Sequence, residues 1–164
     1  MIIYHGSTVP VEAPDILRSE RHLDFGEGFY TTSNREQAVS WANIVALRQE
    51  IETQFISIYE FDLEKAEKEL TIIRFDEPDV EWLNFVCMNR SGRIHPTLYD
   101  MVFGAVANDR VYTVVQFYEN GVYDEDEAIR RLKVDGLYNQ ILFHTEKSLK
   151  YCRFTGYEDL RGLK

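Results

Sequence analysis

Residues 24–36, with the sequence DFGEGFYTTSNRE, form the stretch that decides the fold of this chain. Gly26 and Gly28 stand one residue apart, and glycines let a backbone turn and pass close to another group. A short strand is expected to follow the turn. Ser33 and Glu36 then match a capping box, in which the two residues satisfy each other's backbone N–H groups. The stretch therefore predicts a glycine-rich turn, a strand and the start of a helix.

The helix is expected to run to about Glu50. Its apolar residues recur three or four positions apart, which is the spacing of one helix face; they are Ala38, Trp41, Ala42, Val45 and Ala46.

The elements on either side of this unit follow from hydrophobic periodicity. Strands are expected at residues 2–5, 54–61, 70–75, 99–106, 138–144 and 153–158, and helices at 79–90, 108–118, 126–133 and from 145. Gly6 and Ser7 are expected to end the first strand. Because the order lacks the regular alternation of a parallel sheet, the sequence predicts an α+β domain with mainly antiparallel sheet.

Length and composition indicate one ordinary globular domain over residues 1–164. The net charge of −10 argues against broad nonspecific binding to nucleic acid, which needs a face rich in lysine and arginine. Cys87 and Cys152 show neither a disulfide framework nor zinc-ligand spacing, which favours a cytoplasmic location. The sequence has no apolar run of membrane-helix length and no secretory signal, so we expect no membrane partner.

Three short segments stand out together. They are residues 4–7 (YHGS), residues 28–32 (GFYTT) with Trp41 behind them, and residues 138–141 (YNQI). Each segment alone has an ordinary structural explanation, such as a polar histidine at a strand end or a tryptophan in the core. Taken together, in this order, they carry a resemblance to a known family.

Other nucleotide and metal motifs are missing from the sequence. It contains no glycine-rich Rossmann fingerprint and no Walker lysine motif. His22, His95 and His144 are isolated from one another, which argues against a metal site. Ser7 lacks the context of a nucleophile elbow, and neither cysteine has a visible activating partner.

With these motifs the sequence resembles the ADP-ribosyltransferase superfamily, in the histidine–tyrosine–acid branch that contains diphtheria-type toxins and poly(ADP-ribose) polymerases. More narrowly, it is similar to small bacterial proteins assigned to that superfamily, some of which occur in toxin–antitoxin gene pairs. The similarity to this small group extends over nearly the whole chain, including DFGEGFYTT, FGAVANDRVY and NQILFHTEKSL. It implies a fold of two antiparallel sheets packed at a steep angle, with helices beside an NAD⁺ cleft.

The resemblance also implies roles for particular residues. His5 matches the histidine that binds the adenosine-side ribose, and the backbone of Gly6 would hold the nicotinamide amide. Tyr30 would stack on the nicotinamide ring, with Trp41, eleven positions later, on the other face. The full set expected to bind NAD⁺ is His5, Gly6, Ser7, Gly28, Tyr30, Thr31, Trp41 and Gln140.

The late strand departs from the family pattern. Active polymerases have a glutamate at the position that Gln140 occupies, where its charge stabilises the cation that forms as nicotinamide leaves. An amide keeps the hydrogen bond but supplies no charge, which by analogy costs about 10²- to 10³-fold in rate. Asp135 and Glu146 lie nearby in sequence as alternative acids.

The resemblance therefore implies an NAD-dependent mono-ADP-ribosyltransferase that transfers ADP-ribose to an unidentified acceptor, with His5, Tyr30 and Gln140 as its catalytic residues. An antitoxin is a possible partner if the protein is a toxin. The alternative is a catalytically silent module that binds NAD or ADP-ribose, or a protein partner.

Overall fold

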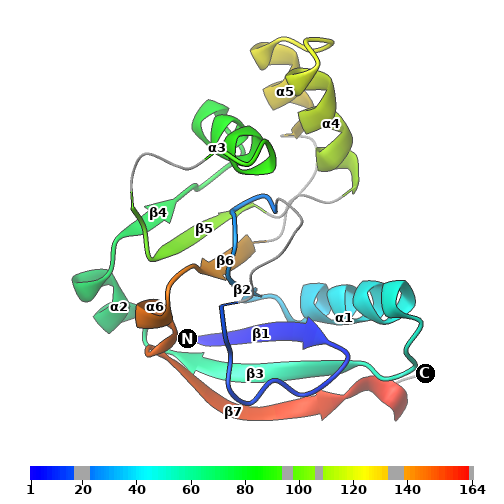
Figure 1. Ribbon diagram of the computed structural model, residues 1–164, viewed down its shortest axis with the longest axis vertical. Coiled ribbons are helices and arrows are strands. Elements are labelled where there is room, and N and C mark those ends of the chain that lie inside the picture. The colour runs from blue at the N-terminus through cyan, green and yellow to red at the C-terminus, as the bar shows by residue number, and fades with distance from the viewer. Residues whose placement is uncertain (17–22, 94–97, 106–108, 133–138, 163–164) are drawn as a thin grey trace.

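The computed structural model describes residues 1–16, 23–93, 98–105, 109–132 and 139–162 (Figure 1). Its strands form two sheets. The first has the order β1-β3-β7 and contains β1 (Ile2–Ser7), β3 (Phe55–Phe61) and β7 (Cys152–Asp159). The second has the order β2-β6-β5-β4 and contains β2 (Phe29–Thr31), β4 (Ile72–Arg74), β5 (Met101–Ala105) and β6 (Asn139–Phe143). The strands of the two sheets run in different directions in Figure 1.

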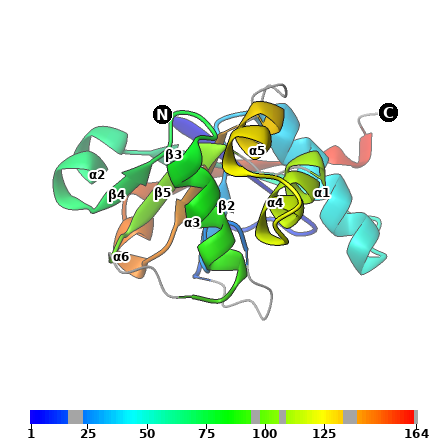
Figure 2. The same ribbon diagram turned by 90° about the horizontal axis from the view of Figure 1, so that it is seen from above.

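Six α-helices lie within the described residues: α1 (Arg35–Gln49), α2 (Leu63–Glu69), α3 (Val80–Arg90), α4 (Asp109–Glu119), α5 (Glu125–Leu132) and α6 (Glu146–Leu149). A 3-10 turn, Leu160–Gly162, follows β7. Helix α1 packs along β1, and α3, α4 and α5 gather beside the four-stranded sheet (Figures 1 and 2). None of the helices within these residues is long and apolar enough to cross a bilayer. The expected α+β class is confirmed, with β3 as the inner strand of its sheet.

One strand pair corrects the expectation of two antiparallel sheets. β4 lies parallel to β5, with Ile72 opposite Met101, whereas the other pairs of described strands are antiparallel. Helix α3 lies between β4 and β5 in the chain, and parallel neighbours need such a crossover because a tight hairpin cannot connect them.

A bridge between Tyr4 of β1 and Thr32, the residue after β2, joins the two sheets. The N–H of Tyr4 donates to the carbonyl of Thr32 at 2.8 Å, and the reverse bond is 3.0 Å long. The Thr32 hydroxyl donates to the carbonyl of Asn139 in β6 at 2.8 Å and accepts the N–H of Asn34 at 3.0 Å. One threonine therefore ties β1, β2, β6 and the start of α1 together.

Asn34 caps α1, so the predicted capping box is wrong by one residue. The Asn34 side chain accepts the backbone N–H of Gln37 at 2.9 Å. Ser33 is held by β6 instead: its N–H donates to Oδ1 of Asn139 at 3.1 Å, and its hydroxyl accepts Nδ2 of Asn139 at 2.6 Å. Because Ser33 is hydrogen-bonded to Asn139 of β6, it does not act as the N-cap of α1.

Two further elements differ from expectation. Strand β1 continues through Gly6 and Ser7, because Ser7 pairs with Phe55 of β3. Helix α2 was not expected; Asp62 caps it, and Ala66 is its buried residue. A seven-residue helix with one small buried side chain leaves almost no apolar periodicity in the sequence.

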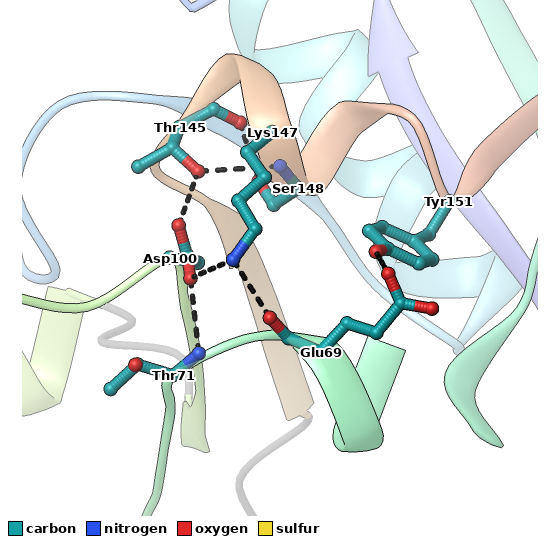
Figure 3. A network of polar contacts seen from close by, with 7 residues as sticks. All are labelled: Glu69, Thr71, Asp100, Thr145, Lys147, Ser148 and Tyr151. Atoms are coloured by element: carbon teal, nitrogen blue, oxygen red, sulfur yellow. Dashed lines mark hydrogen bonds and ion pairs between the residues drawn. The ribbon is translucent and has the colours of Figure 1, made fainter. Parts of the chain in front are cut away.

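Asp100, just before β5, anchors three segments of the chain (Figure 3). Its carboxylate accepts the N–H of Thr71 at 3.0 Å and the hydroxyl of Thr145 at 2.8 Å, and Nζ of Lys147 lies 3.6 Å away. Burial raises the pKa of Asp100, but these partners outweigh it and hold the pKa below its usual value. The role of Asp100 is structural, and Thr145 caps α6, where a helix was expected from residue 145.

Candidate functional site

His5 lies next to the bridge that joins the two sheets. Beyond the bridge at Tyr4, Nδ1 of His5 is 2.7 Å from the carbonyl oxygen of Tyr30, and its ring packs on Phe29 with centroids 4.5 Å apart. Because a carbonyl oxygen only accepts hydrogen bonds, Nδ1 carries the proton. Burial lowers the pKa of His5, and the bond to Tyr30 offsets this only in part. The imidazole is therefore neutral at pH 7, with Nε2 as an acceptor for a hydroxyl.

This burial makes stability depend on pH in a predictable direction. The pKa of His5 is lower in the folded chain than the unfolded value of 6.5, so the folded state binds a proton less readily. Its stabilising contribution is complete above pH 6.5 and is lost as the pH falls below that value. Urea unfolding at pH 7 and pH 5 should show the wild type losing about 1 kcal/mol more than His5→Gln. Equal losses in the two proteins would contradict this assignment.

Gly6 is explained by the close approach of α1 to β1. A Cβ on Gly6 would lie 2.1 Å from the carbonyl oxygen of Ala38 and 2.8 Å from the nitrogen of Ala42. Alternate residues of an antiparallel strand direct their backbone groups to the same edge. The N–H and C=O of Gly6 therefore face the edge at which Tyr4 meets Thr32, beside His5. The sequence had attributed this glycine to ligand access, whereas helix packing requires it here.

Tyr30 extends from β2 onto the face of the four-stranded sheet that α3 covers. Its hydroxyl donates to the carbonyl of Gly26 at 2.5 Å, and its partly buried ring packs against the cluster that contains Leu142. Burial first, and then the negative charge of Asp24, raise the pKa of Tyr30 well above its usual range. The Tyr30 phenol is therefore neutral, and its hydroxyl is fixed by the hydrogen bond to Gly26.

Gln140 lies on the same face of that sheet as Tyr30. Tyr30 pairs with Leu142 across β2 and β6, and Gln140 is two residues before Leu142 on the same strand. Directly paired residues share a face, and diagonal neighbours of this kind have Cα atoms about 7–8 Å apart. The structure thus places Tyr30 and Gln140 on one face of the four-stranded sheet. The His5 ring contacts Phe29, whose side chain points to the opposite face of β2, and His5 reaches Tyr30 only at its backbone carbonyl.

Trp41 is exposed instead of forming core. Its side chain is 46% exposed, whereas Ala38 and Ala42 on either side are buried against β1. The guanidinium of Arg48 lies 5.7 Å from the ring centroid. Trp41 therefore flanks the helix turn that covers Gly6, and its ring makes no contact with the Tyr30 ring among the described aromatic pairs.

Three of the residues predicted to bind NAD⁺ make close contacts within the fold itself. The buried Thr31 points to the face opposite Tyr30 and donates to the carbonyl of Ile141 at 3.1 Å. The Ser7 hydroxyl donates to the carbonyl of Val9 at 2.6 Å. Gly28 lies so close to β6 that a Cβ would come within 2.2 Å of the Phe143 carbonyl oxygen.

Of the two alternative acids, Glu146 does not replace Gln140. Glu146 is exposed in α6, beyond the opposite end of β6, about 10 Å or more along the strand from Gln140. Asp135 lies outside the described residues, as do His22, His95 and Asn108, the expected start of the helix at residues 108–118. Within the described ranges, no three His, Cys, Asp or Glu side chains are placed to hold a metal ion.

Sequence reasoning missed an ion pair between Asp24, which begins the glycine-rich turn, and Arg90. Nε of Arg90, at the end of α3, is 2.6 Å from Oδ1 of Asp24, and both side chains are mostly buried. Asn89 donates to the backbone carbonyl of Asp24 at 3.2 Å, and the Arg90 guanidinium lies 4.5 Å from the ring centroid of Tyr112. Burial raises the pKa of Asp24, and Arg90 opposes that effect. Asp24 begins the quoted DFGEG turn, but its partner is 66 residues away, so no local pattern identified the pair.

The chain belongs to the DUF3990 family, described as proteins of unknown function, because the family model matches residues 1–154. No curated protein and no solved structure matches the chain.

Proposed function

We propose that the chain binds NAD⁺ at the joint between its two sheets and acts as a mono-ADP-ribosyltransferase with the fold of that superfamily. The observation that supports this most directly is the 2.7 Å contact between His5 and the backbone of Tyr30, with Gln140 on the same sheet face as Tyr30. These three positions match the histidine–tyrosine–acid pattern, although they come from strands far apart in the chain.

The residues fit the dinucleotide by the chemistry that they present. Nε2 of His5 accepts a ribose hydroxyl, and the N–H and C=O of Gly6 match a carboxamide, which has one donor and one acceptor side. Tyr30 offers a ring for the nicotinamide, and Trp41 offers a partly exposed aromatic face beside Gly6. Gln140 orients the nicotinamide ribose through a hydrogen bond.

In the proposed reaction, the bond between C1′ of the ribose and the nicotinamide nitrogen breaks, and its electron pair leaves with nicotinamide. The positive charge passes to the ribose, an acceptor nucleophile bonds to C1′, and the acceptor loses a proton. Because the site has an amide where elongating enzymes have an acid, we propose transfer of a single ADP-ribose.

Incubation with labelled NAD⁺ tests this proposal. The wild type should release nicotinamide or modify itself, and Tyr30→Ala should weaken NAD⁺ binding about 10- to 100-fold, since stacking on one aromatic ring contributes that much. Tyr30→Phe is the matched control, because it keeps the ring and removes only the bond to Gly26. If NAD⁺ neither binds nor reacts, the proposed function is wrong.

The amide at Gln140 favours a second candidate function, a module that binds NAD or ADP-ribose without turnover. Saturable binding by calorimetry, without nicotinamide release, would identify it. Self-modification or release that disappears in Tyr30→Ala would identify the enzyme.

A further inference from the structure

Helix α1 carries apolar side chains on the side that faces away from the sheet, as well as on the side that packs against it. The small residues Ala38, Ala42 and Ala46 are buried on the inner side, where α1 lies along β1 and β3 (Figure 1). Four large apolar residues are exposed on the outer side, which we call the outer stripe: Trp41, Ile44, Leu47 and, just past the helix end, Ile51. A surface helix normally has polar side chains on its outer side, and a run of exposed apolar side chains marks a site of interaction.

One flank of the outer stripe is acidic. Glu36, Asn43 and Glu50 follow one another at intervals of seven residues, so they lie along one side of α1, and both glutamates are exposed. On the other flank, the guanidinium of Arg48 lies against the Trp41 ring. Charges at seven-residue spacing beside an apolar stripe are the means by which one helix selects another. A partner for α1 therefore needs an apolar stripe of its own and positive charges along one flank.

A second copy of the chain does not meet this requirement. It brings the same acidic flank, and antiparallel packing of two α1 helices places Glu36 of one copy near Glu50 of the other. The net charge of −10 on each chain adds to the repulsion. The charges thus favour a basic partner over self-association.

We propose that the outer stripe of α1 is the docking site for an amphipathic helix of another polypeptide, with Lys or Arg side chains along the flank that meets Glu36 and Glu50. The apolar side chains of that helix cover Ile44 and Leu47, and its basic flank pairs with the two glutamates. This inference does not rest on the proposed function, because it requires neither NAD⁺ nor turnover.

A synthetic helical peptide tests the inference, with Leu along one stripe, Lys along one flank and Gln along the other. A matched peptide has Glu in place of Lys. The chain has two tryptophans, and Trp82 is fully buried, so quenching of fluorescence by acrylamide reports on Trp41. The Lys peptide should protect Trp41 from quenching and bind about tenfold more tightly than the Glu peptide, since two exposed pairs change from repulsion to attraction.

Two variants separate the apolar and the charged contributions. Leu47→Gln should weaken binding of the Lys peptide about tenfold, because less apolar surface is then covered; Leu47 is 79% exposed, so the fold does not depend on it. Glu36→Gln/Glu50→Gln should remove most of the preference for the Lys peptide. Val122→Gln is the matched control: it replaces an exposed apolar side chain in the turn between α4 and α5 and should leave binding unchanged.

Binding of the Lys peptide that leaves Trp41 open to the quencher, or that Leu47→Gln does not weaken, overturns the inference, because the peptide then lies elsewhere on the acidic surface. Equal affinity for the two peptides, or no binding of either, also overturns it. Protection of Trp41 that rises with protein concentration alone, together with a dimer in sedimentation, would assign the face to a second copy and overturn the inference in favour of self-association. Each of these outcomes leaves the proposed NAD⁺ site to be judged by its own experiment.

Discussion

Gly6→Ala is expected to lower the free energy of unfolding by about 3 kcal/mol, at the upper end of the cost of overpacking. The added methyl group would lie 2.1 Å from the carbonyl oxygen of Ala38. This atom belongs to the backbone of α1, so no side-chain rotation relieves the clash, and the helix must move away from β1. Chemical denaturation of the two proteins measures the difference.

Gly121→Ala is the control for this variant. Gly121 has a positive φ of 68° and open space around a Cβ, so its substitution tests backbone strain without a clash. That strain costs about 1–2 kcal/mol. A loss at Gly6 no larger than the loss at Gly121 would show that α1 and β1 are not packed as closely as described.

Gln140→Glu is expected to increase nicotinamide release about 100-fold if the chain is a transferase. A carboxylate there would lie on the Tyr30 face and stabilise the cation that forms on the ribose, and preorganised charge of this kind has effects of about 10²- to 10³-fold. Single-turnover release from labelled NAD⁺ measures the change.

Asn139→Asp provides the matched control, because it adds the same charge one residue away on β6. Adjacent strand residues point to opposite faces, and Asn139 contacts Ser33 and Thr32 there. Release should therefore remain at the wild-type rate in Asn139→Asp. An equal increase in the two variants would mean that the effect does not depend on the position of the charge.

Part of the candidate site was predictable because its residues lie on or beside short strands that have local signals. The apolar run that ends at His5 placed this histidine on β1, and the turn before Tyr30 placed the tyrosine on β2, although β1 continues through Gly6 and Ser7. Trp41 was placed on the correct helix but on the wrong side of it. Helical spacing groups Trp41 with Ala38 and Ala42, yet the close contact of β1 with the small alanines leaves the larger ring outside.

The sequence by itself determined the α+β class, the strand–helix unit at residues 29–49 and the helix start at Thr145. These features depend on interactions within a few residues, namely caps, turns and the periodicity of burial along one element. Only the tertiary structure decided that β4 runs parallel to β5 and that α1 packs closely on β1 at Gly6. It also decided that Gln140 shares a face with Tyr30 and that Asp24 pairs with Arg90. Those facts depend on which distant strands and helices lie side by side, and residue spacing along the chain does not contain that information.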